Sequence, residues 1–185
     1  GGSSNRGNVD PAPGVQQYPG GVWEGTVGTG AAQRQVVGYI DPGPQGTGGE
    51  FYLAREAPGA AGFDALYGRL NVSVTSVLAT GVTYFSVQDG KFATGLTLRG
   101  TASNSGKIGR TDAISGNYSD PVQTAAAAGA TVPLKLAYSS LNFHTASASL
   151  IEGTYRGTGL FGGGWVLTVT PQGQLECPYH GWQFA

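Results

Sequence analysis

Short runs of alternating apolar and polar residues make up most of the chain from residue 22 onward. The clearest run is 66–77, in which Leu70, Val72 and Val74 fall on one face and small polar residues fall on the other. A period of two residues is typical of a β-strand with one buried face and one wet face.

The alanine run at 125–128 differs, since alanine favours helix but so short a run is only marginally stable as a helix by itself. We predict a loop or one helical turn there.

Turn residues separate these runs and indicate how the strands pair. An Asp-Gly dipeptide at 89–90 stands between the apolar runs 82–87 and 92–99. Both residues tolerate positive φ, so the dipeptide predicts a β-hairpin. Pro133 places the strand Val132–Tyr138 at a strand start or at a sheet edge.

Five further segments complete the pattern. Residues 107–118 predict one strand, and residues 63–67 are compatible with a short helical turn. Near the C-terminus, residues 153–157 and 165–170 predict a hairpin-like pair, and a final strand is expected from residue 175 onward.

The fold class follows from this succession of short strands. Roughly nine or ten strands at spacings near 8–15 residues, with almost no helical signal, predict an all-β protein. An antiparallel up-and-down β-barrel of about 8–10 strands is favoured, because closure removes exposed sheet edges. The alternative is a two-sheet β-sandwich.

The first 20 residues differ in composition from the rest. Gly, Pro, Ser and Asn dominate them and nothing alternates, which is typical of a flexible tether. The alternative is an assembly arm that packs on a neighbouring subunit. We therefore expect a tether or arm over 1–20 and a single β-barrel domain over 21–185.

Composition narrows the class of partner. Only 11% of the residues are charged and the net charge is −1. No basic surface is available to neutralise phosphates, so a nucleic-acid partner is not expected. One cysteine cannot form a disulfide within the chain, so stability has to come from packing of the strands.

Several short motifs resemble one group of bacterial proteins. The segment 21–25, Gly-Val-Trp-Glu-Gly, and the later segments 98–101, 134–138 and 150–155 are similar to the pattern of Gly-rich β-barrel lipoproteins of the proteobacterial envelope. The resemblance implies an extracytoplasmic barrel at the outer membrane, periplasm or cell surface of a Gram-negative bacterium. It implies membrane contact only through an N-terminal lipid anchor, whose cysteine is not in this chain. That group has no assigned catalytic residues.

The C-terminal segment 177–182, Cys-Pro-Tyr-His-Gly-Trp, is similar to the second half of a Rieske iron–sulfur pattern. That cluster needs two Cys and two His, but Cys177 is the single cysteine and His144 is the one other histidine besides His180. These three residues also leave a zinc ion one protein ligand short. We therefore expect no cofactor and no metal.

We interpret this C-terminal segment as a candidate interface. Trp182 and Phe184 are expected to be packed or to lie at a contact surface, and Cys177 could form an intermolecular disulfide.

No catalytic residue is identified. The nucleophile motif Gly-x-Ser-x-Gly is missing from the sequence, and His144 has no Ser or Asp motif around it. The carboxylates, among them Asp64, fall mostly at predicted turns.

The function expected from sequence is therefore non-enzymatic. The first hypothesis is an envelope or cell-surface barrel that binds a partner protein or a ligand. The alternatives are a self-assembling extracellular subunit of a filament or surface layer, which uses its N-terminal arm or strand addition, and an immunity or inhibitor protein.

Overall fold

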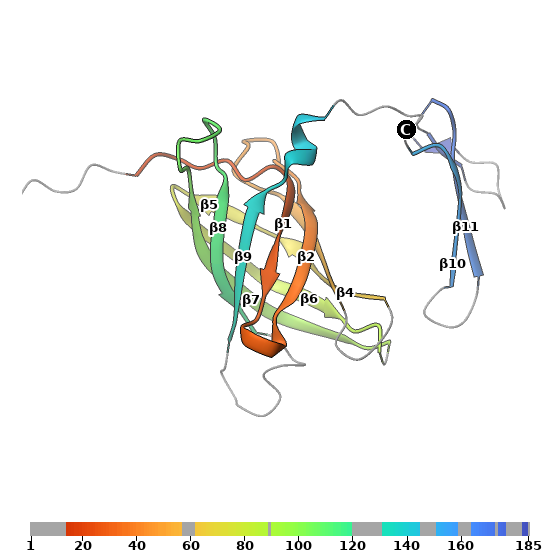
Figure 1. Cartoon of the computed structure of the whole chain (residues 1–185), viewed down its shortest axis with the longest axis horizontal. Helices are drawn as coiled ribbons and strands as arrows, with labels where there is room; N and C mark the ends of the chain where they lie inside the picture. Colours follow the sequence, from red (N-terminus) through yellow and green to blue (C-terminus); the bar gives the residue numbers. More distant parts are fainter. Residues whose placement is uncertain are drawn as a thin grey trace, which may run out of the picture. The chain divides into compact units, whose positions relative to one another are not determined.

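The computed structural model describes residues 14–56, 62–88, 90–119, 131–144, 151–158, 164–172, 174–176 and 183–184 of the 185-residue chain. The chain divides into two compact units, Gly1–Asn142 and Phe143–Ala185, and we describe each by itself. The first unit contains a β-barrel, and the second contains a small antiparallel sheet (Figure 1).

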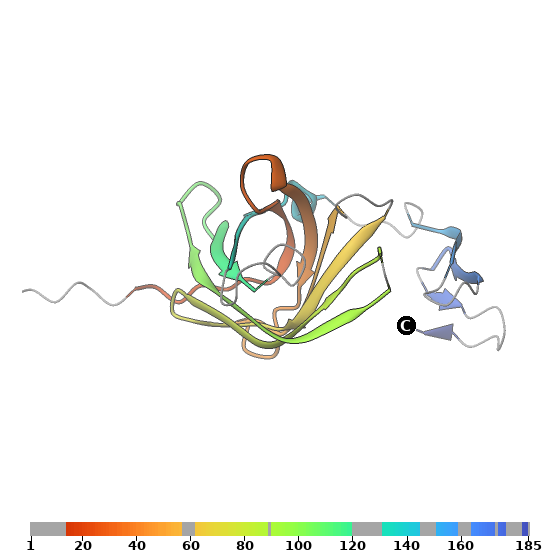
Figure 2. The same ribbon diagram turned by 90° about the horizontal axis from the view of Figure 1, so that it is seen from below.

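Eight antiparallel strands form the closed barrel (Figure 1, Figure 2). Each strand pairs with its neighbours along the chain, β4 pairs with β6, and β9 pairs with β1 to complete the ring. The up-and-down barrel expected from the sequence is thus confirmed. The barrel strands are β1 (Gly21–Val27), β2 (Arg34–Ile40), β3 (Glu50–Glu56), β4 (Phe63–Arg69), β6 (Ser76–Phe85), β7 (Phe92–Ser103), β8 (Ala113–Tyr118) and β9 (Val132–Tyr138), and shorter elements are β5 (Asn71–Ser73) and the 3₁₀ helices η1 (Gly30–Ala32) and η2 (Ser140–Phe143).

Alternate residues of the strands point into the barrel and form one hydrophobic core. An eight-stranded barrel has an interior just wide enough for side chains to fill. The largest side chains in that interior have almost no exposed surface; they include Trp23, Phe51, Leu98, Ile114 and Leu134.

Trp23 of β1 fills one end of this interior and depends on glycines beside it. Its ring is fully buried, lies edge-on to Tyr138 at 5.3 Å, and donates from Nε1 to the carbonyl of Pro19 at 2.7 Å. Gly38 is its cross-strand partner on β2. A Cβ on Gly38 would lie 1.9 Å from the backbone oxygen of Tyr52. Only glycine allows the strands to approach this closely, so the bend of the barrel depends on it.

The run 66–77, expected to be one continuous strand, is divided by a tight turn. Leu70 and Val72 are buried as predicted, but Val74 lies in the turn between β5 and β6, is 40% exposed and has φ of 55°. A positive φ is unusual for a β-branched residue, so local sequence preference does not predict this turn. Val74 is held from outside the hairpin: its N–H donates to Oε1 of Gln16, and its carbonyl accepts from the N–H of Gln17.

Residues 14–20 pack against their own barrel, which differs from the tether or intersubunit arm expected over 1–20. Figure 1 shows the segment crossing one end of the barrel. Gln17 is buried and accepts a hydrogen bond from Thr111 Oγ1 at 2.9 Å. Arg110 donates to the carbonyl of Gly20 at 2.8 Å and lies 3.9 Å from the ring centre of Tyr138. Composition alone does not reveal these contacts, because backbone groups supply several of them. Residues 1–13 lie outside the described residues.

Two other predicted elements are corrected. Residues 63–67 belong to strand β4, not to a helical turn. The strand expected over 107–118 begins only at Ala113, and Ile108 lies in the preceding loop with 40% of its surface exposed. The carboxylate of Asp112 accepts hydrogen bonds from the N–H and hydroxyl of Ser105, which hold that loop closed.

The β9 strand has the bounds that the sequence predicts. Pro133 is its second residue, as expected for a strand start. The alternative, a sheet edge, is wrong because β9 pairs with β1 on one side and β8 on the other. Since β9 is paired on both sides, it is not free for strand addition.

The second unit contains the predicted hairpin. Strands β10 (Gly153–Thr158) and β11 (Gly164–Val169) are antiparallel, followed by β12 (Leu175–Glu176) and β13 (Gln183–Phe184) in the same sheet. The expected single barrel over 21–185 therefore differs from the described part of the chain, in which the barrel strands lie within 21–138. A closed barrel has no free edge, so the later strands pair with one another.

We predict that the segment at 14–20 stabilises the barrel. Gln17→Ala removes the acceptor of the buried Thr111 hydroxyl, so the free energy of unfolding should fall by about 1–3 kcal/mol in urea denaturation. Val15→Ala is the matched control, because the Val15 side chain is 77% exposed. Equal stability of the two variants would contradict this role.

Candidate functional site

The candidate interface predicted from the sequence lies mostly outside the residues that the structure describes. Cys177 and Trp182 lie outside the described residues, and of Phe184 only the backbone is described, in β13. His144 follows η2 and its side chain is exposed. The interface assigned to Cys177, Trp182 and Phe184 therefore stays a prediction.

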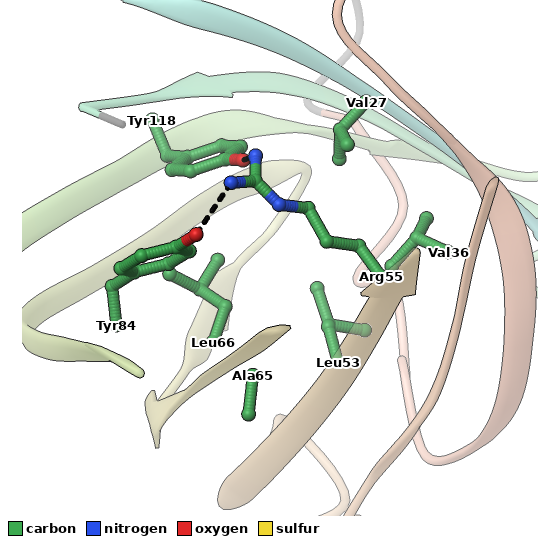
Figure 3. Close-up of a pocket in the computed structure, with 8 residues that line it drawn as sticks. All are labelled: Val27, Val36, Leu53, Arg55, Ala65, Leu66, Tyr84 and Tyr118. Carbon is green, nitrogen blue, oxygen red and sulfur yellow. Dashed lines mark hydrogen bonds between the residues drawn. The ribbon is translucent and has the colours of Figure 1, made fainter. Parts of the chain in front are cut away.

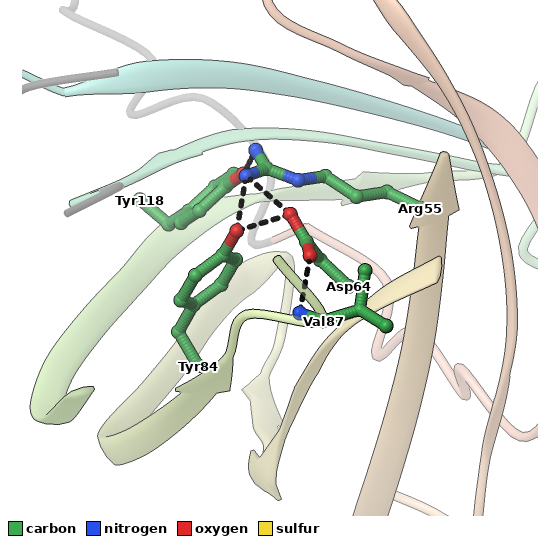
Figure 4. Close-up of polar contacts among 5 residues, drawn as sticks. All are labelled: Arg55, Asp64, Tyr84, Val87 and Tyr118. Atoms are coloured by element: carbon green, nitrogen blue, oxygen red, sulfur yellow. Dashed lines mark hydrogen bonds and ion pairs between the residues drawn. The ribbon is translucent and has the colours of Figure 1, made fainter. Parts of the chain in front are cut away.

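A buried polar cluster lies inside the barrel instead, near the end opposite the 14–20 segment. Arg55 on β3 and Asp64 on β4 face each other in register, and their side chains form an ion pair at 3.2 Å. Arg55 also donates to the hydroxyls of Tyr84 at 2.7 Å and Tyr118 at 3.0 Å. The other carboxylate oxygen of Asp64 accepts from the N–H of Val87 at 3.0 Å (Figure 4). Four separate strands therefore converge on one guanidinium.

Apolar side chains enclose this cluster and leave almost no space. Figure 3 shows Arg55 reaching past Val27, Val36 and Leu53 toward the two tyrosines. The cavity beside it measures about 10 Å³, which is room for about one water molecule. The cluster is therefore part of the packed interior and has no room for a ligand.

Burial also controls the protonation of Tyr84. Desolvation and the hydrogen bond that its hydroxyl donates to Asp64 raise the pKa of Tyr84 well above its ordinary value. Tyr84 therefore stays neutral over the physiological range and acts as a hydrogen-bond donor to the carboxylate. A buried group that already donates to Asp64, beside a cavity this small, has no access to a substrate proton.

The sequence did not identify this cluster. The sequence predicts Asp64 at a turn, but it lies on β4 with its side chain buried. An Arg and an Asp nine residues apart become cross-strand partners only because β3 and β4 form a hairpin. One sequence signal could have identified the pair: a charged residue at a position of an alternating strand that faces inward.

The outer surface carries a second feature, a row of three tyrosines. Tyr39, Tyr52 and Tyr67 are cross-strand neighbours on β2, β3 and β4. The rings of Tyr52 and Tyr67 stack at 5.5 Å with an interplanar angle of 16°. These strands belong to a well-packed barrel, and on its outer surface Tyr39 is 49% exposed and Tyr52 is 59% exposed.

A shallow hollow runs beside the tyrosine row, and we call it the acidic groove. Val37 and Ala54, small cross-strand neighbours, line it between larger residues. Glu24, Glu56 and the 62%-exposed Phe63 also line it, and its volume is about 400 Å³. The groove thus combines an apolar lining with two carboxylates.

Other kinds of site find no support in the described residues. No group of three or more His, Cys, Asp or Glu side chains in the described part of the chain is placed to hold a metal ion. Among the same residues, no helix is long and apolar enough to cross a membrane. No protein-family model, curated protein or solved structure matches this chain.

We predict that removing one member of the Arg55–Asp64 ion pair destabilises the protein more than replacing both members by apolar residues. Arg55→Leu leaves the Asp64 carboxylate buried without its cation, and the free energy of unfolding should fall by about 3–5 kcal/mol. The double variant Arg55→Leu/Asp64→Leu should lose less free energy of unfolding than Arg55→Leu, because no unpaired charge stays buried. Urea denaturation at neutral pH measures both. A double variant less stable than Arg55→Leu would contradict this account.

We also predict a stability loss at alkaline pH. The unfolded chain releases the Tyr84 proton near the ordinary tyrosine pKa of about 10, whereas the folded protein holds it more tightly. Stability from this group is therefore complete below about pH 10 and falls as pH rises above it. Tyr84→Phe should show a smaller decrease in urea midpoint between about pH 9 and 11 than the wild type. Equal decreases would be inconsistent with this assignment.

Proposed function

We propose that this protein is a non-enzymatic binding barrel that contacts a partner protein through the outer face of β1–β4. The interior supports this proposal because it leaves no space for the internal ligand site that is usual in barrels. Barrels that hold small ligands need an internal cavity, but this one is filled by side chains and by the Arg55 cluster. The buried ionisable groups of that cluster bind one another and lie away from solvent.

The acidic groove with its tyrosine row is the observation that carries the proposal. Tyrosine combines a large apolar ring with a polar hydroxyl, and it is enriched where proteins contact each other. Tyr52 and Phe63 expose most of their rings on neighbouring strands, beside a lining of small residues. An aromatic anchor from a partner would find both contact area and room there.

The shape of the groove favours a protein over a small molecule. Small-molecule sites enclose most of the surface of their ligand. The acidic groove is open on the outside of the sheet, and exposed residues such as Glu56 and Phe63 line it. A broad surface with a central hollow suits a protein side chain that inserts into it.

The location of the protein remains part of the proposal. The resemblance to proteobacterial envelope lipoproteins supports an extracytoplasmic barrel at the outer membrane, periplasm or cell surface. An immunity or inhibitor protein would be a specific form of the same binding function. Self-assembly is the alternative, in which the partner protein is a second copy of this chain.

The test compares partner capture by groove variants and a matched control. Immobilised full-length protein would be exposed to an envelope extract from cells that produce it. Tyr52→Ala and Phe63→Ala should reduce retention of a specific protein by about tenfold or more, since aromatic anchors in an interface contribute several kcal/mol. Leu78→Ala, at another exposed apolar residue on β6, should retain it.

Mass spectrometry would identify the retained protein, with another copy of this chain scored among the candidates. If no retained protein depends on Tyr52 or Phe63, the groove is not the binding surface. Circular dichroism and melting temperature of each variant would show that the barrel is intact.

A further inference from the structure

A second hollow lies on the outer face of the barrel, over β7, β8 and β9 (Figure 1). Arg99 of β7 pairs across the strands with Asn117 of β8. Ser115, two residues earlier on β8, has Thr101 of β7 on one side and Lys135 of β9 on the other. These five exposed residues line a depression of about 490 Å³, which we call the basic hollow. Each of their side chains carries a hydrogen-bond donor: a guanidinium, an ammonium, two hydroxyls and an amide.

Two glycines hold β7 and β8 close together at this hollow. Gly100 and Gly116 are cross-strand partners, and both line the depression. A Cβ on either one would collide with a backbone oxygen of the opposite strand. Glycine inside a strand often marks such a close approach of two backbones. The pair therefore keeps the donors of β7 directly beside those of β8.

The two cations of the basic hollow are not neutralised by an ion pair. Within the residues that the structure describes, no ion pair involves Arg99 or Lys135, and no Asp or Glu lines the hollow. Glu24 of β1 is the carboxylate that faces Lys135 from the neighbouring strand, where it lies diagonally across the β1–β9 ladder. The basic hollow thus adjoins the acidic groove along β1 and β9, and Arg99 lies on the far side of it.

Two cations among neutral donors suit an oxyanion. Neighbouring strands lie about 4.8 Å apart, so the backbones of β7 and β9 are about 10 Å apart. Arg99 and Lys135 rise from these two strands, and the strand between them carries only short polar side chains on its outer face. An anion above β8 would therefore accept hydrogen bonds from both cations and from the short side chains beneath it.

The number of donors favours phosphate over a carboxylate. A carboxylate has two oxygens and one charge, whereas a phosphate monoester has three acceptor oxygens and a charge of about −1.5 to −2 at pH 7. Five donor-bearing side chains and two positive charges match the phosphate more fully. The guanidinium of Arg99 also suits it, because arginine donates two parallel hydrogen bonds to a phosphate.

We propose that the basic hollow binds a single phosphate group, carried by a soluble compound or by a lipid headgroup. Arg99 donates the paired hydrogen bonds, Lys135 supplies the second charge, and Ser115 and Asn117 donate to the oxygens that remain. Two cations do not form the extended basic surface that a nucleic-acid strand needs. The site goes beyond the proposed protein-binding function and does not depend on it.

A titration with inorganic phosphate tests the site. Backbone amide NMR signals of the full chain would be followed near neutral pH, with sodium chloride adjusted to keep the ionic strength constant. The signals of Gly100, Ser115, Gly116 and Asn117 should shift together and saturate, because these residues line one hollow.

A charge-matched pair of variants shows whether the two cations are responsible. Arg99→Gln/Lys135→Gln should weaken phosphate binding by about tenfold or more, since both charge-assisted contacts are lost. The control Arg69→Gln/Lys107→Gln makes the same change in net charge at two exposed cations outside the hollow and should bind as the wild type does. Circular dichroism would show that the barrel is intact in each variant.

The adjoining carboxylate gives a prediction of opposite sign. Glu24→Gln removes a negative charge beside Lys135, so phosphate should bind about two- to threefold more tightly. Glu50→Gln makes the same change in net charge on β3 and should leave the affinity for phosphate unchanged. An unchanged affinity in Glu24→Gln would contradict the placement of the phosphate at Lys135.

Vesicles distinguish the two sources of the phosphate group. Phosphatidylcholine vesicles with and without phosphatidic acid, whose headgroup is a phosphate monoester, would be sedimented with the protein. Sedimentation that requires phosphatidic acid and is lost in Arg99→Gln/Lys135→Gln would identify a lipid headgroup. Saturable binding of inorganic phosphate without such sedimentation would identify a soluble phosphate compound. If neither probe binds in a manner that depends on Arg99 and Lys135, the proposal is overturned, and the protein-binding function of the acidic groove is unaffected.

Discussion

The pairing of β4 with β6 is the interaction on which the rest of the structure depends, because it closes the ring. Without it the barrel would be an open sheet with exposed edges, a liability for any soluble β-protein. Closure requires the chain to reverse tightly after β5, and Val74 adopts a positive φ there. Gln16 and Gln17 bind the backbone of that turn, so the N-terminal segment contributes to closure.

A closed ring of eight strands has a small interior, and its contents follow from that size. Trp23 occupies one end, where Gly38 on the next strand leaves space for the close approach of the backbone. Arg55 occupies the other end, where Asp64 balances its charge and its two terminal nitrogens donate to the hydroxyls of Tyr84 and Tyr118. A buried ion pair is weak support for stability in itself, but it specifies which strands meet. This one ties β3 and β4 to β6 and β8.

A filled interior leaves the outer surface as the place for contacts with other molecules. On that surface the alternation of the strands turns every second residue outward, and the ladder of hydrogen bonds lines these residues up across strands. Tyr39, Tyr52 and Tyr67 form a row in this way, and the same geometry brings Glu56 and Phe63 together beside them. The proposed binding function rests on side chains positioned by strand register.

The sequence by itself determined the all-β class, the barrel and the positions of most strands, because a period of two residues is a local signal of a half-buried strand. It also determined β9 to the residue and the late hairpin of β10 with β11. Only the tertiary structure decided where Val74 turns the chain, how residues 14–20 pack, and that the strands from Gly153 onward form their own sheet. It alone brought Arg55 to Asp64 and the tyrosines into a row. These features depend on strand register and barrel closure, which the local alternation of apolar and polar residues does not specify.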